Sequence, residues 1–370
     1  MEILNLTPGR LYTIDSLPLF RISGPEAPYR SLAVEIEGKE IYRIGAIHDC
    51  PVNIADIIRL AIIGARRPVV SVTVTARQQF PGEQPESVSV TFDVISYIPE
   101  DIDADGLKLT LLPPFFINTF SSYLIPDSED PEVLIFSMRN FRLQVSAFYK
   151  GEWYNLKTIA FAAKSSEITH VFRVTLDSVE LRQILIGKLI DIQDIPARDP
   201  LKRVSVRILP FDPLMDDDTI PLQSVSFYFT ENSPSSRFSF FNKWMAAETF
   251  HSFGEWSNSR KISASKTTVD SMIRAFDRKI ESEIVLKSHG ISTIDAEKLS
   301  GIADMLPDIT VVRYLGTQNV SVEAVISEIS VETADSDSAK VEIKAIPKSD
   351  KVPAPDFPGI HSSEFTGHFT

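Results

Sequence analysis

Apolar and polar residues alternate with a period of two through most of the chain, and this pattern restricts the fold more than any other feature. Successive side chains of a β-strand point to opposite faces of a sheet, so the alternation is typical of strands with one buried face. It is clearest in the segments 30–45, 68–80, 87–96, 141–163, 203–211 and 222–232. We therefore predict a mainly β fold, with two or three β-sandwich or β-barrel-like domains and a few short helices.

Turn residues between the alternating runs predict hairpins. Gly38–Lys39 and Lys150–Gly151 each separate two such runs, and the segment 81–86 separates a third pair. The segment 269–288 is ambiguous, because its apolar residues fit helical spacing at first and alternate later. Its second half favours a strand.

Only two segments have a convincing helical pattern. The first is NIADIIRLAIIGARR, with Asn53 as its N-cap and Gly64 as its stop. The second is DAEKLSGIADML, about three turns long, with Ser292 or Asp295 near its cap. Two short helices in a β-rich chain are expected.

The 370 residues exceed one ordinary core and predict several domains. An acidic, Gly-containing segment near residue 100 and the segment 191–202 are the candidate linkers. We expect an N-terminal β domain with one short helix (1–100) and a middle β domain (101–200). The remainder, 201–370, is expected to be a β-rich domain with one helix and an extended C-terminal arm.

Charge and composition narrow the expected partners. The formal net charge is −13, and basic residues form no cluster larger than pairs such as Arg66–Arg67, which disfavours nucleic-acid binding. The single cysteine, Cys50, excludes an internal disulfide. The first residues lack the apolar core of a signal peptide, and no run reaches the roughly 18 apolar residues of a membrane helix. We expect a chain made in the cytoplasm, without membrane insertion.

No motif of a catalytic, cofactor or metal site is present in the sequence. The consecutive residues 48–50 (HDC) cannot all converge from a strand, which favours a turn over a catalytic cysteine. The three acids of 216–218 lack the later Glu of a calcium loop, which favours a solvated loop over a bound ion. Glu248 and His251 have the spacing of di-iron ligands, but only one such pair occurs. We expect no enzyme activity, no cofactor and no metal.

The densest aromatic stretch, RFSFFNKWMAAETFHSFGEW, spans 237–256 and holds two of the three tryptophans. One interpretation places its aromatic residues in the core. The other is a partly exposed platform, because Trp is enriched at protein interfaces and also stacks on sugar rings. On the second interpretation, the candidate interface residues are Trp244, Phe250 and Trp256.

This stretch resembles the pattern F-x-W-x-N-x-x-G-x-x-E-T of a loosely defined family of tail structural proteins from phages and prophages of Bacteroidetes. The order of parts is also similar: VNIADIIRL, the AAETF stretch, EIVLKSHGIS, a helix, PDITVVRYL and a β-ribbon. The likeness covers roughly the last 140 residues well and the first 210 in outline. This chain has NKWMAAET where the pattern has a glycine, and the pattern includes no catalytic residues. The resemblance implies a virion part near the tail tip or baseplate, of distal-tail type.

We therefore expect a virion structural protein of a phage tail, made in the host cytoplasm. It would assemble into a homo-oligomeric ring with heterologous interfaces and attach neighbouring tail proteins. The alternative is a carbohydrate-binding or adhesin-type β-sandwich module at the cell surface, which the lack of a signal peptide disfavours. An enzyme is the third possibility.

The C-terminal segment 348–370 is rich in Pro and Gly and has no periodicity. Its apolar residues can enter successive pockets of a partner, and a Pro-rich, extended start lowers the entropic cost of ordering. We predict an arm along a neighbouring subunit, against the alternative of a tail folded onto its own domain. The candidate interface residues of this arm are Phe357, Ile360, Phe365 and Phe369.

Overall fold

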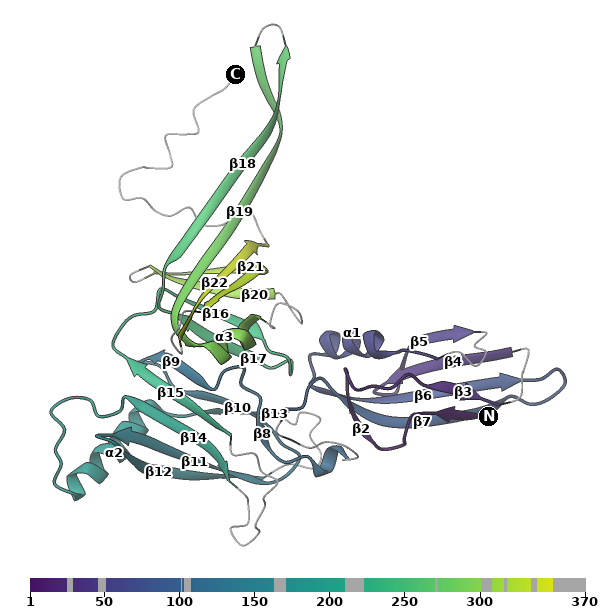
Figure 1. Ribbon diagram of the computed structural model, residues 1–370, viewed down its shortest axis with the longest axis horizontal. Coiled ribbons are helices and arrows are strands. Elements are labelled where there is room, and N and C mark those ends of the chain that lie inside the picture. The colour runs from purple at the N-terminus through teal and green to yellow at the C-terminus, as the bar shows by residue number, and fades with distance from the viewer. Residues whose placement is uncertain are drawn as a thin grey trace.

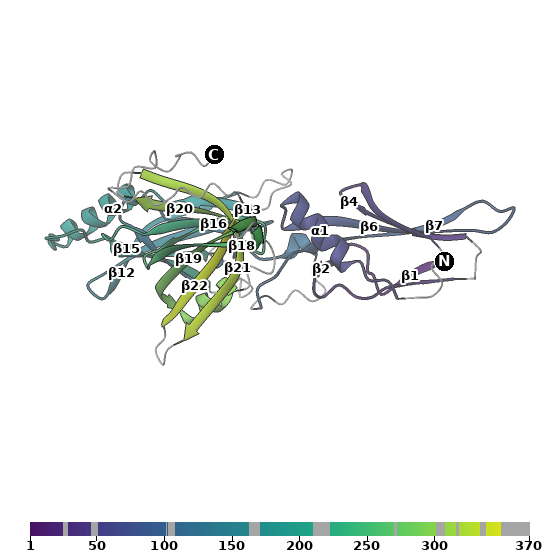
Figure 2. The ribbon, with the colours of Figure 1, turned by 90° about the horizontal axis from the view of Figure 1, so that it is seen from above.

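The structure is a computed structural model in which three domains follow one another along the chain (Figure 1). It describes residues 1–24, 29–45, 51–100, 102, 108–162, 171–209, 223–269, 272–300, 308–315, 318–333 and 338–348. Figure 2 shows the N-terminal domain extending to one side of the other two. The described residues form five sheets and few helices, which confirms the predicted mainly β fold.

The N-terminal domain is a five-stranded sheet of order β2-β7-β6-β4-β5, with β1 and β3 paired beside it. Its strands are β1 (Glu2–Leu4), β2 (Leu11–Thr13), β3 (Arg21–Ser23), β4 (Tyr29–Ile36), β5 (Lys39–Gly45), β6 (Val69–Gln79) and β7 (Glu86–Ile95). The first predicted hairpin is present, but its turn is Glu37–Gly38, one residue before the expected position. Both turn residues have positive φ, 51° and 74°, as a two-residue turn between twisted strands requires.

Helix α1 (Ala55–Ala65) packs its buried isoleucines against this sheet. The Oδ1 of Asn53 accepts a hydrogen bond of 2.9 Å from the N–H of the first helical residue, close to the capping role expected for it. The predicted stop at Gly64 is wrong. The helix continues to Ala65 and ends where Arg66 takes a left-handed φ of 52°.

The middle domain has a five-stranded sheet of order β12-β11-β14-β15-β9 and a three-stranded sheet of order β13-β10-β8. The strands are β8 (Phe115–Phe116), β9 (Ser122–Pro126), β10 (Glu132–Phe136), β11 (Phe141–Tyr149), β12 (Glu152–Phe161), β13 (Val171–Thr175), β14 (Arg203–Leu209) and β15 (Ser224–Thr230). The expected boundary at residue 200 divides this domain, because β14 pairs with β11 and β15 pairs with β14. The middle domain therefore extends to residue 230.

Helix α2 (Ser178–Asp191) was not predicted from the sequence. The side chain of Asp177 accepts hydrogen bonds from two backbone N–H groups of the first turn, each at 2.9 Å, and so caps the helix. One face of the helix is fully buried in the domain core, through Leu181, Leu185 and Leu189. The capping residue and the spacing of the leucines are local signals, and both are present in the sequence.

The C-terminal domain is a seven-stranded sheet of order β17-β16-β20-β21-β22-β19-β18. Its elements are β16 (Ser236–Phe241), β17 (Ala247–Ser252), β18 (Trp256–Val269), β19 (Met272–Ser292), α3 (Thr293–Ser300), β20 (Asp308–Leu315), β21 (Gln318–Thr333) and β22 (Ser338–Pro347). The ambiguous segment 269–288 is strand wherever it is described. At α3, Ser292 Oγ accepts a hydrogen bond of 3.1 Å from Asp295 N, which agrees with the cap predicted there.

Strands β18 and β19 form a long hairpin that rises away from the rest of the molecule (Figure 1). Strand β19 pairs with β22 only from Ile284 to Ser292. Toward the tip, within the described backbone, each strand pairs only with the other. A two-stranded ribbon is marginally stable by itself and presents two unpaired edges.

The three domains are not independent of one another. The middle and C-terminal domains share one continuous hydrophobic core, in which Phe120 packs against Phe240 and Phe250. A smaller cluster, here called the junction cluster, contains residues of all three domains and of the connection between the first two. It consists of Leu11, Ile95, Ile102, Leu109, Leu112, Phe115, Ile117, Leu134, Phe136, Trp244 and Ala246.

Candidate functional site

The aromatic stretch 237–256 begins with the hairpin of β16 and β17. Phe238, Phe240 and Phe250 lie in the core shared by the middle and C-terminal domains. The interface prediction for Phe250 is therefore wrong, because its ring packs within its own chain.

The turn of this hairpin is inserted between the domains. Asn242 Oδ1 accepts hydrogen bonds from the N–H groups of Trp244 and Ala246, at 3.0 and 3.1 Å. The indole Nε1 of Trp244 donates to the carbonyl oxygen of Tyr97 at 3.0 Å, and the two rings meet edge to face. Trp244 is only 4% exposed, so its prediction as an exposed interface residue is wrong. It anchors an internal junction instead.

Met245 occupies the position where the resembling pattern has its glycine, three residues before Glu248. Its φ is 58°, in the left-handed region that glycine enters without strain. The methionine side chain is buried in the core of the N-terminal domain. Burial of this side chain offsets the backbone strain of the turn.

Glu248 is a buried carboxylate that binds β17 to the loop between β8 and β9. Its two oxygens each lie 3.0 Å from the backbone nitrogen of Thr119, and Oε2 accepts from Thr119 Oγ1 at 2.7 Å. The Tyr123 hydroxyl and Asn242 Nδ2 also donate to it. Every one of these partners can donate, which suits the acceptor-only carboxylate. The Glu248 side chain thus connects three separate segments.

Burial raises the pKa of Glu248 above its ordinary value, although the hydrogen bonds from Tyr123, Thr119 and Asn242 act in the opposite direction. Burial also raises the pKa of Tyr123 well above the usual range, and the neighbouring Glu248 carboxylate adds to this shift. The Tyr123 phenol is therefore protonated at neutral pH and available as a donor.

The raised pKa of Glu248 predicts a specific pH dependence of stability. In the window between the ordinary pKa of Glu, about 4.3, and the raised folded pKa, the native state holds a proton that the unfolded state has lost. The contribution is fully present below this window and is lost as pH rises through the folded pKa. The free energy of unfolding of the wild type minus that of Glu248→Gln should therefore fall from pH 4 upward and then level off. Urea titrations at several pH values measure it, and a difference that rises with pH would contradict the assignment.

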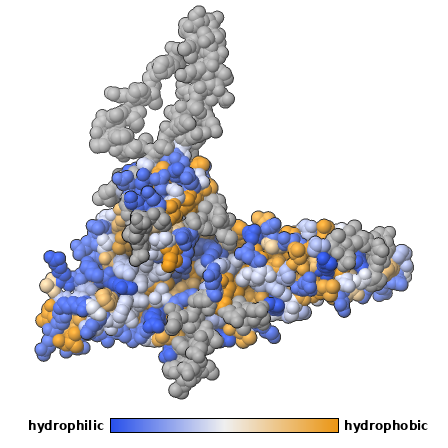
Figure 3. Space-filling view, in the orientation of Figure 1, coloured by the Kyte–Doolittle hydropathy of each residue, from blue (hydrophilic) through white to orange (hydrophobic). Residues whose placement is uncertain are grey.

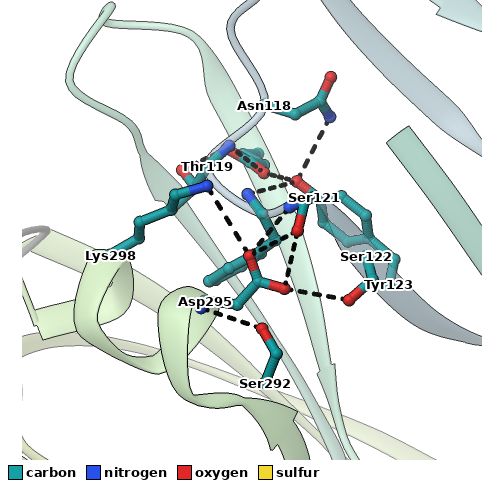
Figure 4. A network of polar contacts seen from close by, with 10 residues as sticks. Asn118, Thr119, Ser121, Ser122, Tyr123, Ser292, Asp295 and Lys298 are labelled. Atoms are coloured by element: carbon teal, nitrogen blue, oxygen red, sulfur yellow. Dashed lines mark hydrogen bonds and ion pairs between the residues drawn. The ribbon is translucent and has the colours of Figure 1, made fainter. Parts of the chain in front are cut away.

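A second buried carboxylate, Asp295 of α3, holds the same loop (Figure 4). Its Oδ1 accepts from Ser121 N at 2.9 Å and from Ser121 Oγ at 3.1 Å, and its Oδ2 accepts from Ser122 Oγ at 3.0 Å. Lys298 Nζ lies 3.9 Å from Oδ1. The β8–β9 loop is thus held by carboxylates from two elements that lie more than a hundred residues further along the chain.

A hollow of about 800 Å³ lies beside this network. Lys243 lies in its wall, with Nζ 3.0 Å from the centroid of the Tyr97 ring and 4.8 Å from that of Trp244. Desolvation lowers the pKa of Lys243 to about 8; the charge of Lys298 adds to this shift and that of Glu100 opposes it. The hollow has charged residues of both signs in its lining, so its chemistry favours neither anions nor cations.

Three sequence motifs were weighed as possible metal or catalytic sites, and the structure describes one of them. Glu248 and His251 do not converge, and His251 Nε2 instead lies 2.7 Å from Glu129 Oε2. The described residues contain no group of three or more His, Cys, Asp and Glu that could hold a metal ion. The motifs at 48–50 and 216–218 lie outside the described residues. Among the helices that the structure describes, none is long and apolar enough to cross a membrane.

The other predicted interface residues stay predictions. The structure describes only the backbone of Trp256. Outside the described part of the chain altogether lie Phe357, Ile360, Phe365 and Phe369.

The roles of Tyr123, Asn242 and Asp295 in joining segments were not predicted, because each of them also has a partner more than a hundred residues away along the chain. Trp153, which lies exposed on the five-stranded sheet of the middle domain, was not predicted as a functional residue either. The predicted turn at Lys150–Gly151 was a usable signal, since it places Trp153 opposite Phe148 in the hairpin register.

No protein-family model and no curated protein matches the sequence. Two solved structures with similarity to the chain are of the phage p2 baseplate in its activated conformation, one with strontium and one with calcium. They are 10% and 9% identical, with a TM-score of 0.23, and the match covers 32% of this chain and 45% of each baseplate chain. A third, PcdhgB3 EC1-4, is 11% identical over 85% of this chain and 72% of its own, with a TM-score of 0.16. The chain thus spans less than half of the baseplate chains, and likeness at these TM-scores carries no functional argument.

Proposed function

We propose that the chain is a virion structural protein of a phage tail, placed at the tail tip or baseplate. It acts by assembling with copies of itself into a ring and by attaching neighbouring tail proteins, and it has no enzyme activity. The resemblance of the aromatic stretch to tail structural proteins supports the setting. The structure supports a mechanical role, because the aromatic stretch packs the three domains against one another.

The apolar patch on α2 is the observation that carries the proposed assembly. The helix buries its leucines on one face, while Val179, Ile186 and Ile190 lie exposed on the opposite face. Ile192 and Ile195, just after the helix, are also exposed. Figure 3 shows hydrophobic residues gathered at the end of the molecule where Figure 1 places α2. An apolar group of this kind on a surface marks a contact with another protein.

The β18–β19 hairpin is a second feature suited to assembly. Its unpaired strand edges can add to a sheet of a neighbouring chain through backbone hydrogen bonds. Contact with a neighbour would also stabilise a ribbon that is marginal alone.

Replacing Ile190 with Lys tests the proposed assembly. A lysine in the last turn of α2 is compatible with the helix dipole, so the protomer should fold normally. We expect the wild type to sediment as an oligomer and I190K to sediment as a protomer, with a loss of association of about 2 kcal/mol or more. Leu60→Lys, on the exposed side of α1, is the matched control and should assemble like the wild type. A wild type that stays monomeric at high concentration, or an I190K variant that assembles normally, contradicts the role of this patch.

A further inference from the structure

The outer face of the five-stranded sheet of the middle domain carries a row of large side chains, one from each strand. The register places Trp153 opposite Phe148, Arg203 opposite Tyr228, and Tyr228 opposite Leu124. Three members are exposed: Trp153 by 48%, Tyr228 by 38% and Leu124 by 43%. Large apolar side chains that lie exposed together on one face of a sheet often mark a binding surface.

Arg203 lies at the centre of this row. Its guanidinium carbon is 5.0 Å from the ring centroids of Trp153 and Tyr228 and 5.8 Å from that of Phe148. Among the described residues, its buried Nε has no hydrogen-bond partner. The aromatic rings stabilise the cation in part. An anion from outside would add charge-assisted hydrogen bonds at the terminal nitrogens.

The rest of this face has polar residues without negative charge. The rows next to the aromatic one contain Asn155 opposite Ser146, and Thr158 opposite Gln144. The outward positions of the described strands include Arg142, Arg203 and Arg207 but no Asp or Glu. Asp295 of α3 lies against Ser122 at the β9 end of this face, but the outward strand positions around the exposed Trp153 and Tyr228 include Arg203 and no acid. In a chain with a formal charge of −13, this part of the face is complementary to an anionic ligand.

We propose that this face binds an acidic carbohydrate, a saccharide whose rings carry carboxylates. The sugar rings stack on Trp153 and Tyr228, and a carboxylate pairs with the Arg203 guanidinium. The exposed Asn155 and Thr158 supply hydrogen-bonding groups for sugar hydroxyls beside the aromatic row. This binding concerns the isolated chain and does not depend on its proposed role in a tail.

A nucleic acid also combines rings that can stack on aromatic side chains with negative charge, but its backbone carries more charge per unit length. Its affinity comes from many phosphate contacts, whereas the described strands place only three arginines on this face. A polysaccharide with one carboxylate per sugar has widely spaced charges with neutral hydroxyls between them. This spacing suits a face on which a few arginines lie among neutral hydroxyl and amide side chains. The chemistry of the face therefore favours the saccharide.

Calorimetric titration of the full chain with an oligogalacturonate tests the proposal, with the methyl-esterified oligosaccharide as the uncharged probe. We expect the acidic form to bind, and the methyl ester to bind about tenfold more weakly because it cannot pair with arginine. Trp153→Ala should weaken binding about tenfold, whereas Trp153→Phe, which keeps a ring, should recover most of it. Arg203→Gln should remove the preference for the acidic probe. The matched control Arg21→Gln, at an exposed position of β3, should bind like the wild type.

Circular dichroism of each variant verifies that it is folded. The proposal is wrong if the acidic oligosaccharide does not bind, or if Trp153→Ala binds it as well as the wild type does. It is also wrong if a single-stranded oligonucleotide of equal charge binds more tightly. A Trp153→Ala variant that changes only sedimentation, and not saccharide binding, would identify the face as a contact between copies of the chain.

Discussion

Replacing Glu248 with alanine is expected to lower the free energy of unfolding by about 3–5 kcal/mol. The substitution leaves the Thr119 N–H and hydroxyl, the Tyr123 hydroxyl and the Asn242 amide without their shared acceptor inside the protein. Each unpaired buried donor costs about 1–3 kcal/mol. The raised pKa shows that burial already disfavours the charged form, so relief of that desolvation offsets part of the loss. Several donors lose their acceptor, whereas the desolvation cost of only one carboxylate is removed. The net effect is therefore a lower free energy of unfolding.

Urea unfolding of the purified variants measures this effect. Glu248→Gln keeps one acceptor oxygen and should lie between the wild type and Glu248→Ala. Glu323→Ala, at an exposed position of β21, is the control and should stay within about 0.5 kcal/mol of the wild type. Hydrogen exchange of the Thr119 amide should become faster in Glu248→Ala. Equal stability of the Glu248 and Glu323 variants would show that the network is not needed for folding.

Replacing Trp244 with alanine is expected to cost about 3–5 kcal/mol of folding stability. The loss combines a cavity in the junction cluster with the missing hydrogen bond from the indole to the Tyr97 carbonyl. Because the indole contacts the end of the N-terminal domain, we also expect that domain to unfold separately from the other two. Trp244→Phe retains most of the apolar volume and should lose only about 1 kcal/mol, mainly through the missing indole hydrogen bond.

Thermal unfolding followed by two probes separates these effects. Circular dichroism follows unfolding of the whole chain. Limited proteolysis follows the accessibility of the connection between the first two domains. Sedimentation of the variant at a temperature where it is folded tests the earlier expectation of an interface role. If Trp244→Ala keeps its stability and loses only its association with other chains, the assignment to an internal junction is wrong.

The aromatic stretch shows why residue density does not distinguish a core from an interface. Phe250 and Trp244 are of residue types that are common at protein interfaces, yet both are covered by residues of the same chain. The covering residues, Phe120 and Tyr97, lie more than a hundred positions earlier. A local pattern cannot reveal such coverage, because burial depends on which distant segment packs against it.

Helix α2 was not predicted for a different reason, since its signals in the sequence are local. A capping Asp177 and three leucines four residues apart specify a helix by themselves. Its outward face is also apolar, at Val179, Ile186 and Ile190, which weakened the contrast between the two faces. The feature that concealed the helix is the same one that now supports an assembly surface.

The sequence by itself determined the local conformation of most strands and hairpins. Alternation with period two and turn residues such as Lys150–Gly151 act within a few residues, so they can be read without the fold. Only the tertiary structure decided which strands share a sheet, and it placed β14 and β15 in the middle domain. It also brought Glu248 to Thr119, 129 positions earlier in the chain. Those pairings depend on long-range packing and on the desolvation of charges, and neither leaves a period in the sequence.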